Sequence, residues 1–389
     1  MDLGTSTQAT ISYEESKVLR ALLGDLAQEA SERRFEVAPN PCVGAAVLSN
    51  GVEIGRGFHE YWGGAHAEVN ALAAAEASGV ARELWDTIVV TLEPCSSTGK
   101  TAPCSEALLV AGIKRVVVGS LDPDPRHRGK SLESLHKVGV EVVLLKGASP
   151  LHSTAPHFER WMQPDRLRRP RPWTISKWAQ TRTGQLSPPD HVGEGRWISC
   201  QASLDQVQLL RSSVDAVITG IGTVLADDPR LSVRPPGDLS KPPLRVIIDS
   251  HLRTRPEMRI LQACGPDEAA GEVHIFALPA VDFVRQRELK AAGAIVHAVS
   301  PGDDGCPSLR EICTVLWGLG VRRQLVEAGP VLTKSWFQSE LVDQLKVYTG
   351  DVNGGEGPNL VNLLALDKLL DPRHSEVGVD SLLQAFPKY

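Results

Sequence analysis

The alternation of apolar and polar positions predicts a helix, a hairpin and a second helix at the start of the chain. Residues Tyr13 to Ala30 repeat apolar side chains at helical spacing, which predicts an amphipathic helix. Two short strands, Val43–Leu48 and Glu53–Gly57, flank Asn50-Gly51, a pair that favours a tight hairpin turn. An alanine-rich helix is then predicted to begin near His66, which places this histidine in its first turn.

Strands and helices alternate through the rest of this half. Apolar, β-branched runs predict strands at Thr87–Leu92, Ile113–Ser120 and Val140–Leu145. Helices are expected from Cys104 onward and over Lys130–Lys137. This alternation predicts a three-layer α/β/α domain, in which ligands usually bind outside the carboxyl ends of the strands.

A second alternating pattern fills the chain beyond residue 172. The predicted strands are Trp173–Trp178, Ala216–Thr219, Leu244–Ile248, Val273–Ala277, Gln324–Glu327, Leu345–Tyr348 and Val377–Gln384. The predicted helices are Ser203–Ser212, Asp282–Ala291, Ser308–Leu319 and one from Gly329 to about Ser339. Between the two patterns, Arg166–Pro172 is basic and proline-rich, which favours a solvated linker over a phosphate-binding patch. We therefore expect two α/β domains, residues 1–147 and 148–389, with residues 148–172 as the linker.

Composition narrows the function classes. The chain has 389 residues, of which 42% are hydrophobic, and its net charge of −6 argues against a general nucleic-acid or membrane-surface binder. It has no run of eighteen apolar residues, so no membrane span is expected. The polar first ten residues do not resemble an export signal. Seven cysteines, an odd number, do not resemble a disulfide framework, so a cytoplasmic location is expected.

The strongest chemical signal is His66-Ala67-Glu68, followed by Pro94-Cys95 and Cys104. One His and two Cys can hold a zinc ion, and a catalytic zinc leaves its fourth position for water. The metal lowers the pKa of that water, and a nearby carboxylate such as Glu68 can carry its proton to the substrate. This pattern is typical of zinc-dependent nucleobase deaminases, although eight residues rather than two separate the cysteines here. A structural zinc site would need a fourth ligand, which the pattern lacks.

The second half offers weaker signals in its glycine turns. Gly220-Ile221-Gly222 and Glu327-Ala328-Gly329-Pro330 each follow a predicted strand. Glycine and a helix N-terminus together suit a phosphate, but tight turns in a domain that binds none explain the pattern equally well. The dinucleotide fingerprint G-x-G-x-x-G is absent from the sequence.

The first domain resembles the deaminase domain of bifunctional riboflavin-biosynthesis deaminase/reductase proteins. The resemblance rests on Pro39–Gly44, Gly63–Leu72, Glu93–Cys104 and Asp122–Pro125, and that family also uses eight residues between the cysteines. It implies a cytidine-deaminase-like fold. By this resemblance the zinc ligands are His66, Cys95 and Cys104, the proton shuttle is Glu68, and the pyrimidine contact is Asn40.

The second domain resembles the reductase domain of the same family, which is similar in fold to dihydrofolate reductase and uses NADPH. The matching segments are Thr223–Arg234, Arg245–Ser250, Val326–Pro330 and Leu341–Leu345. The resemblance implies NADPH contacts at Ala179, Trp197, Thr223, Asp227, Ser250 and Gly329, and sugar-phosphate contacts at Lys177, Leu231, Arg234 and Glu327. From the residues alone, Trp197 is equally explained as a core side chain, and Asp227 or Arg234 as part of a surface ion pair.

The chain departs from the family's pattern at several positions near these sites. Ser96-Ser97-Thr98 replaces a loop that contains histidine in the family, and Asp124, His127 and Ser131 replace Asn, Val and Gly. In the second domain Thr183 replaces a carboxylate and Gly195 replaces a serine.

The resemblance implies a bifunctional enzyme of riboflavin synthesis. It would deaminate 2,5-diamino-6-(5-phosphoribosylamino)pyrimidin-4-one hydrolytically with zinc, then reduce the ribosyl group to ribityl with NADPH. The expected partner is a small pyrimidine nucleotide, without nucleic acid or membrane, and a homo-oligomer of two or four chains is expected. Two alternatives are a deaminase with an impaired reductase-like domain and a nucleic-acid base deaminase with an accessory domain. A third, a regulator built on two inactive domains, is disfavoured by the intact zinc ligands and Glu68.

Overall fold

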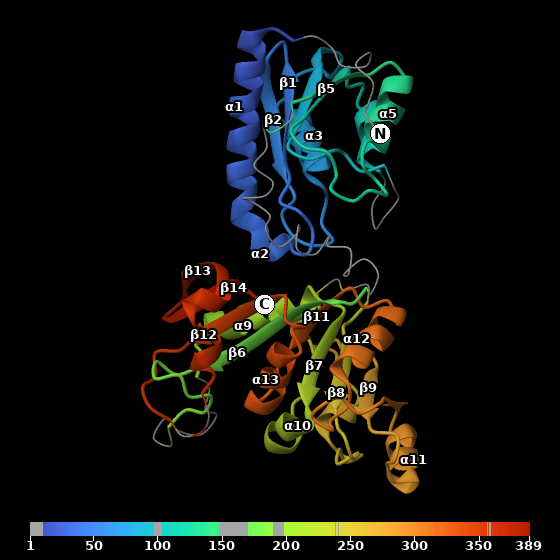
Figure 1. Ribbon diagram of the computed structural model, residues 1–389, viewed down its shortest axis with the longest axis vertical. Coiled ribbons are helices and arrows are strands. Elements are labelled where there is room, and N and C mark those ends of the chain that lie inside the picture. Colours follow the sequence, from blue (N-terminus) through green and yellow to red (C-terminus); the bar gives the residue numbers. More distant parts are fainter. Residues whose placement is uncertain are drawn as a thin grey trace. The chain divides into compact units, whose positions relative to one another are not determined.

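The computed structural model describes residues 11–96, 103–145, 147, 170–189, 198–237, 239, 241–355, 357 and 359–389. The chain divides into two compact units, Met1–Arg168 and Arg169–Tyr389, each with its own sheet (Figure 1). Most of the predicted linker, residues 148–172, lies outside the described residues. In the part of the chain that is described, no helix combines the length and apolar content needed to cross a bilayer.

The first unit is built on a mixed sheet with strand order β2-β1-β3-β4-β5. The first two strands form an antiparallel hairpin, β3 runs antiparallel to β1, and β4 and β5 run parallel to β3. Asn50 and Gly51 both have positive φ in the hairpin turn, as the Asn-Gly pair predicts. The strands are β1 (Gly44–Ser49), β2 (Val52–Phe58), β3 (Thr87–Val90), β4 (Arg115–Val118) and β5 (Glu141–Leu144).

Helices cover both faces of this sheet, which confirms the predicted three-layer fold (Figure 1). Alternate residues of each strand belong to different cores, because successive side chains of a strand point to opposite faces. Ala46 and Val89 pack under α1, whereas Val47 and Ile88 pack under α3, α4 and α5. The helical segments are α1 (Tyr13–Ala30), η1 (Ser31–Arg33), α2 (Arg34–Val37), α3 (Ala67–Ala77), η2 (Arg82–Leu84), α4 (Cys104–Val110) and α5 (Lys130–Lys137).

Two glycines on β2 allow α3 to lie directly against the sheet. A Cβ at Gly57 would lie 2.1 Å from the backbone nitrogen of Ala71, and one at Gly55 would lie 2.3 Å from that of Ala75. Any larger residue at either position would push the helix away from the strand. The glycines of β2 and the alanines of α3 thus fix the position of the helix that begins after His66.

The second unit has a larger sheet with strand order β10-β9-β8-β7-β11-β6-β12-β14-β13. The seven strands from β10 to β12 run parallel, and the β13–β14 hairpin adds to β12 antiparallel. The strands are β6 (Trp173–Gln180), β7 (Ala216–Gly220), β8 (Leu244–Ile248), β9 (Val273–Ala277), β10 (Ala294–Ala298), β11 (Arg323–Val326), β12 (Gln344–Thr349), β13 (Leu369–Val377) and β14 (Asp380–Pro387).

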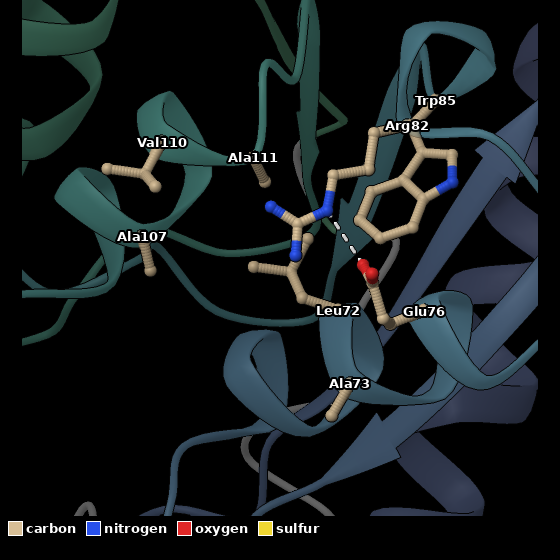
Figure 2. A pocket seen from close by; sticks show the side chains of 8 residues that line it. All are labelled: Leu72, Ala73, Glu76, Arg82, Trp85, Ala107, Val110 and Ala111. Atoms are coloured by element: carbon tan, nitrogen blue, oxygen red, sulfur yellow. Dashed lines mark hydrogen bonds and ion pairs between the residues drawn. The ribbon is translucent and has the colours of Figure 1, made fainter.

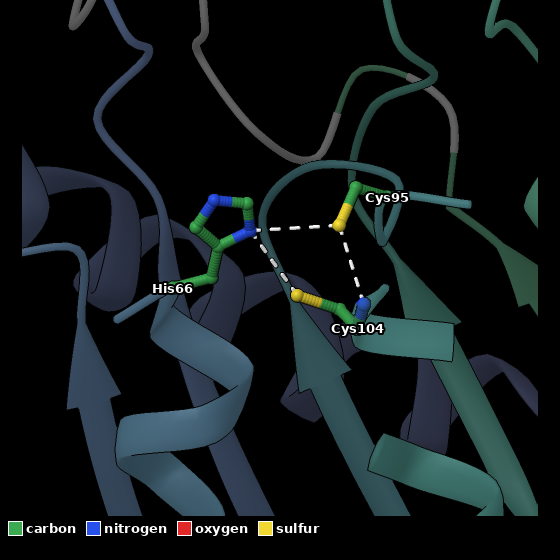
Figure 3. A group of neighbouring side chains, drawn as sticks. All are labelled: His66, Cys95 and Cys104. Atoms are coloured by element: carbon green, nitrogen blue, oxygen red, sulfur yellow. Dashed lines mark hydrogen bonds between the residues drawn. The ribbon is translucent and has the colours of Figure 1, made fainter. Parts of the chain in front are cut away.

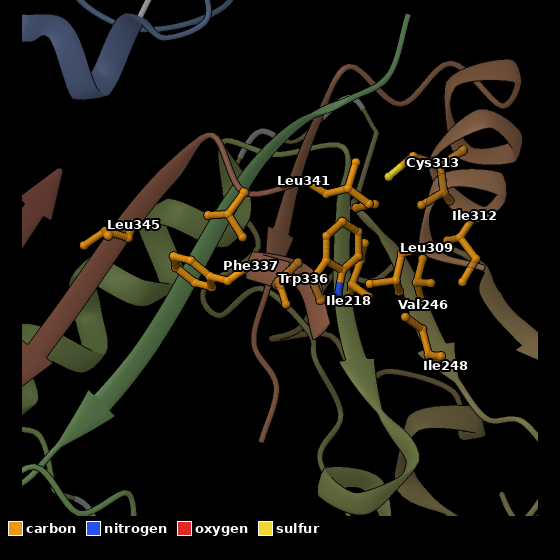
Figure 4. Packing of buried hydrophobic residues seen from close by; sticks show 14 of the residues in the cluster. Ile218, Val246, Ile248, Leu309, Ile312, Cys313, Trp336, Phe337, Leu341 and Leu345 are labelled. Atoms are coloured by element: carbon orange, nitrogen blue, oxygen red, sulfur yellow. The ribbon is translucent and has the colours of Figure 1, made fainter. Parts of the chain in front are cut away.

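The main core of this unit lies on one face of the sheet. Leu309 and Ile312 of α12 and Trp336 and Phe337 of α13 pack there against alternate residues of the strands, such as Ile218 (Figure 4). A smaller cluster on α9, β12 and β14 includes Val207 and Tyr348. The helical segments are α9 (Gln201–Ser212), α10 (Ile221–Asp227), η4 (Arg259–Leu261), α11 (Phe283–Ala291), α12 (Leu309–Gly318), α13 (Pro330–Gln338), η5 (Val361–Leu363) and η6 (Leu366–Lys368).

The predicted elements differ from the observed ones mainly at the end of the chain. The strand expected over Val377–Gln384 runs instead from Asp380 to Pro387, because Gly378, with φ of 62°, makes the turn of a hairpin. Its partner β13 was not predicted, since its sequence contains Pro372 and several charges. Proline and charge are typical of edge strands, and the β13–β14 register shifts between Leu370 and Arg373, on either side of Pro372.

The structure differs from the sequence predictions in four further places. The short strand β10 was not predicted, and Ile221-Gly222 forms the start of helix α10 rather than an open turn. His66 is the residue before the first helical position of α3, with extended backbone, rather than part of its first turn. Arg171 was expected in a solvated segment but is buried against Asp343, with the guanidinium donating to both carboxylate oxygens at 2.6 and 2.8 Å.

Candidate functional site

The three predicted zinc ligands meet at one point of the first unit (Figure 3). Nδ1 of His66 lies 3.2 Å from Sγ of Cys104 and 3.6 Å from Sγ of Cys95, and all three ligand atoms lie within 4.8 Å of one another. His66 comes from the start of α3, Cys95 from the loop after β3, and Cys104 from the first position of α4. Carboxyl ends of strands and starts of helices therefore build the cluster, as the alternating pattern predicts.

The donor set and its spacing fit a zinc ion. Zn–S bonds of about 2.3 Å and Zn–N bonds of about 2.0–2.1 Å place a tetrahedral N···S pair about 3.5–3.6 Å apart. The two measured N···S separations, 3.2 and 3.6 Å, lie at or near this range. Hydrogen bonds from the Cys104 side chain and from its backbone N–H, 3.2 Å away, lower the pKa of the Cys95 thiol. This effect favours the thiolate that a metal requires.

Glu68 lies beside this cluster in the first turn of α3, and its side chain is only 3% exposed. Burial raises the pKa of its carboxyl, and hydrogen bonding to its own backbone N–H together with the charge of His66 opposes this. The charge of Cys95 and a hydrogen bond with Cys104 also act on the group, so the carboxyl lies close to two of the ligands. A buried carboxyl beside a metal site can take up and release a proton during a reaction.

Asn40 is oriented by a histidine that the sequence analysis did not single out. Nδ1 of His59 lies 3.0 Å from the carbonyl oxygen of Ala65 and must donate to it, which leaves Nε2 as an acceptor in the neutral ring. Burial lowers the pKa of His59, so the neutral form is favoured. Nε2 accepts from the Asn40 amide at 3.1 Å, and this fixes which way the amide faces. The only signal in the sequence was a histidine at the end of a strand near His66.

Glu93, two residues before Cys95, anchors the segment from Asp122 to Ser131, in which several residues depart from the family's pattern. Its carboxylate accepts from the backbone N–H of Gly129 at 2.8 Å and from that of Asp122 at 3.2 Å. The hydroxyl of Ser131, which replaces a family glycine, donates to the same carboxylate at 2.9 Å. The substitution therefore adds a hydrogen bond to the loop. Of Ser96-Ser97-Thr98, only Ser96 lies within the described residues.

Asp124, which replaces a family asparagine, is also accommodated. Its Oδ1 accepts from the backbone N–H of Arg126 at 2.8 Å, as an asparagine oxygen would. The additional negative charge pairs with the exposed guanidinium of Arg126. The hydrogen bond from this guanidinium is the main reason why the pKa of Asp124 is lowered. His127 lies 3.9 Å from the same carboxylate.

In the second unit, the structure brings two predicted substrate contacts together. Lys177 of β6 and Glu327, directly after β11, are both largely buried, with Nζ 4.0 Å from Oε2. Arg211 of α9, which the sequence analysis did not single out, donates to both oxygens of Glu327 at 2.7 and 3.0 Å. The pKa of Lys177 is lowered by burial. That of Glu327 is lowered to about 2, because Arg211 and Lys177 outweigh the opposing effect of burial.

Two predicted cofactor contacts also lie close together. The hydroxyl of Thr223 on α10 lies 3.8 Å from the point that a Cβ at Gly329 would occupy. Gly329 is the residue before α13, so bare backbone and the positive end of a helix face this hydroxyl. Ala179 lies on the same face of β6 as Lys177, two residues along the strand. These features suit a phosphate-bearing cofactor such as NADPH.

The other predicted contacts are placed individually. Leu231 is buried with a left-handed backbone, φ 52°, an arrangement that costs energy in a non-glycine residue. The guanidinium of Arg234 lies 3.7 Å from the carboxylate of Glu268, an ion pair that is compatible with either interpretation of this residue. Asp227 ends α10 with an exposed side chain, and Ser250 follows β8. Trp197 and Gly195 lie outside the described residues.

Thr183, which replaces a family carboxylate, holds a neighbouring loop. Its hydroxyl oxygen accepts from the backbone N–H of Gly354 at 2.9 Å and lies 3.1 Å from the hydroxyl of Thr181. A carboxylate at this position could accept the same N–H. The departure therefore keeps this loop contact.

A shallow groove of about 310 Å³ lies on the outer side of α3, η2 and α4 (Figure 2). Arg82 packs over the Trp85 ring and donates to Glu76 at 2.7 Å along its edge. None of the predicted site residues lines it.

Two family models match the chain. Residues 20–120 match the cytidine and deoxycytidylate deaminase zinc-binding region, and residues 172–383 match the RibD C-terminal domain. The first range includes the metal cluster and Glu68. The second includes Lys177, Arg211 and Glu327.

Curated proteins and solved structures match almost the whole chain. The riboflavin biosynthesis protein RibD of Escherichia coli (strain K12) is 33% identical over 88% of this chain and 90% of its own length. RibD of Aquifex aeolicus (strain VF5) is 32% identical over 86% of this chain and 87% of its own length. The structure of Acinetobacter baumannii RibD, form 1, has a TM-score of 0.63 at 27% identity and covers 96% of this chain and 100% of its own. A structure from Thermotoga maritima has a TM-score of 0.62 at 26% identity and covers 96% of this chain and 100% of its own. It is described as a diaminohydroxyphosphoribosylaminopyrimidine deaminase/5-amino-6-(5-phosphoribosylamino)uracil reductase.

Proposed function

The chain belongs to the RibD family of bifunctional riboflavin biosynthesis proteins, and we propose that the residues described above carry the family's two reactions. It is a deaminase with a zinc-binding domain and a reductase that uses NADPH. The observation that carries the assignment of residues is the meeting of His66, Cys95 and Cys104 beside the buried Glu68.

In the first reaction, water replaces the amino group on a ring carbon of 2,5-diamino-6-(5-phosphoribosylamino)pyrimidin-4-one, and ammonia leaves. Zinc held by His66, Cys95 and Cys104 supplies Lewis acidity that lowers the pKa of water. Glu68 accepts a proton from the attacking water and delivers it to the departing amine. Asn40, held by His59, orients the pyrimidine ring.

In the second reaction, the ribosyl group of the deaminated product is reduced to a ribityl chain. NADPH supplies the hydride, so the protein contributes binding, orientation and charge. Thr223, Gly329, Ala179, Asp227, Ser250 and Trp197 are proposed to hold the cofactor. Lys177, Leu231, Arg234 and Glu327 are proposed to hold the sugar phosphate, with the ammonium of Lys177 and the guanidinium of Arg234 suited to its oxygens.

Both activities can be measured on one preparation. We expect ammonia release from the diaminopyrimidine nucleotide without NADPH, and NADPH oxidation when the deaminated product, 5-amino-6-(5-phosphoribosylamino)uracil, is supplied directly. Ammonia release without NADPH oxidation would refute the reductase assignment and favour an impaired second domain. Failure of the first step would refute the deaminase assignment.

Three further expectations remain part of the proposal. The functional domains are residues 1–147 and 148–389, with residues 148–172 as the linker. A cytoplasmic location is supported by seven free cysteines at positions that do not pair. A homo-oligomer of two or four chains is expected, and light scattering of the purified protein tests it.

A further inference from the structure

The ammonium of Lys177 is buried beside a carboxylate and an aromatic ring. Its Nζ lies 4.0 Å from Oε2 of Glu327, which is too long for a hydrogen bond. It also lies over the ring of Tyr348, 5.8 Å from the ring centroid, within the reach of about 6 Å for a cation–π contact. Among the residues that the structure describes, no group accepts a hydrogen bond from this ammonium. The carboxylate and the ring therefore hold it by electrostatic attraction alone.

The register of the sheet brings the ring of Tyr348 beside Lys177. Strands β6 and β12 run parallel, and Tyr348 pairs with Ala179, two residues along the strand from Lys177. The three side chains share one face of the sheet, because residues two apart on a strand point the same way. Tyr348 is buried in a cluster with Val207 of α9 and Leu382 of β14. This packing fixes the ring where the ammonium meets it.

Tyr348 meets the cation with its ring rather than with its hydroxyl. Burial and the charge of Glu327 raise the pKa of Tyr348, so the hydroxyl keeps its proton and carries no charge. That hydroxyl donates to Oε1 of Gln206 on α9, 3.3 Å away. A phenolate is thus excluded as the counter-ion of Lys177. What remains is the electron-rich face of the ring, which attracts cations through its quadrupole.

An aromatic face suits a buried ammonium that must also bind a substrate. Burial lowers the pKa of Lys177, the charge of Glu327 opposes this effect, and the charge of Arg211 adds to it. A further attraction for the charged form is therefore useful at this place. Unlike a carboxylate that accepts hydrogen bonds, the ring leaves the three N–H donors of the ammonium available to oxygens of a bound substrate.

We propose that Tyr348 is a positioning residue of the reductase reaction, whose ring holds the Lys177 ammonium where it meets the sugar phosphate. The inference rests on the proposed reductase function of this unit. It predicts that the ring is required and that the hydroxyl is not.

The first test compares Tyr348→Phe with Tyr348→Leu in the full chain loaded with zinc. Phenylalanine keeps the ring, so reductase kcat/KM with 5-amino-6-(5-phosphoribosylamino)uracil and NADPH should stay within about threefold of the wild-type value. Leucine removes the ring, and kcat/KM should fall about 10- to 30-fold, which corresponds to a cation–π interaction of about 1.4–2 kcal/mol in a desolvated site. Ammonia release should stay unchanged in both variants.

Phe386→Leu is a matched control for the loss of a buried ring. Phe386 lies on β14 in the same unit and contacts Trp173 edge-on, with ring centroids 6.2 Å apart. The substitution should lower the unfolding temperature, because it leaves a cavity, and should leave reductase kcat/KM within about threefold.

A second test changes the charge distribution of the ring and hardly its shape. Fluorine withdraws electron density, so 3,4,5-trifluorophenylalanine has nearly the shape of phenylalanine but attracts a cation less. In place of Tyr348 it should lower reductase kcat/KM about tenfold relative to Tyr348→Phe. In place of Phe386 it should leave kcat/KM unchanged. A merely structural role of the Tyr348 ring predicts no difference at either position.

The possible outcomes have distinct meanings. A wild-type chain that oxidises NADPH, together with a Tyr348→Leu loss of less than about fivefold, overturns this inference alone. A Tyr348→Phe loss of more than about tenfold would assign the effect to the hydroxyl, and a trifluorophenylalanine variant as active as Tyr348→Phe would assign it to packing; either result overturns the inference. A change confined to the KM for NADPH would place the ring at the cofactor and overturns it as well. A wild-type chain that oxidises no NADPH overturns the proposed reductase function, and this inference with it.

Discussion

Replacement of Glu68 by glutamine should abolish ammonia release while the metal stays bound. The amide has nearly the same shape as the carboxyl, and the three ligand side chains are untouched, so packing in the first turn of α3 should persist. The variant loses only a group that accepts and delivers protons. General acid–base catalysis contributes about 10²–10⁴ to a rate, or roughly 3–5 kcal/mol of barrier. Because Glu68 is proposed to act in both proton transfers, we expect the upper end of this range.

The assay measures ammonia release, zinc content and NADPH oxidation on one preparation. Glu76→Gln is a matched control, because Glu76 lies on the same helix in an exposed ion pair with Arg82, which contributes little to stability. The control should keep full ammonia release. NADPH oxidation with the deaminated substrate should be unchanged in both variants. A Glu68→Gln protein that holds zinc and keeps more than about a tenth of its ammonia release would refute the acid–base role.

Four further outcomes are expected. We expect about one zinc ion per chain, and its removal by a chelator should stop ammonia release but leave NADPH oxidation with the deaminated substrate unchanged. Loss of both activities would contradict a zinc site confined to the first unit. Gly57→Ala should lower zinc content and ammonia release together, because its Cβ would lie 2.1 Å from the Ala71 nitrogen and would displace α3, the helix that begins after His66. Unchanged values would show that α3 shifts at little cost. Asp343→Ala should lower the free energy of unfolding, measured in urea, by about 3–5 kcal/mol, because it leaves the Arg171 charge buried and unpaired. A loss below about 1 kcal/mol would contradict a stabilising role of that ion pair. The pKa of Glu327 is lowered from 4.5 to about 2, so its contribution to stability is present above pH 4.5 and is lost as the pH falls toward 2. Glu327→Gln should therefore flatten the acid side of the stability curve, and equal slopes would contradict the shift.

Much of the fold could be predicted because its strands are short, buried and apolar. The bounds of α5, β8 and β9 coincide with the predicted ones, since each stretch is bordered by glycine, proline or charge. The edge strand β13 could not be predicted in this way. Its residues are mostly polar and include a proline, so its position depends on the neighbouring strand β14 rather than on its own pattern.

The candidate metal site was easier to predict than the reductase site, for a physical reason. A metal needs specific ligand types, and His66, Cys95 and Cys104 supply them at a spacing that can be recognised in the sequence. Arg211 and His59 contact other side chains of the two sites, and these contacts depend on the packing of segments far apart in the chain. Arg211 and Glu327 are 116 residues apart in sequence, and nothing in the local pattern of α9 indicates their contact.

The presence of a separate sheet and a separate core in each unit has a genetic consequence. A substitution at Glu68 and one at Lys177 would affect different steps of the proposed function, and neither residue lies in the sheet or core of the other unit. A cell that carries one allele of each kind should therefore still make the reduced product, since every chain retains one working half. Pairs of loss-of-function alleles should sort into two complementation groups, and the border between them should map close to the division of the chain into its two units.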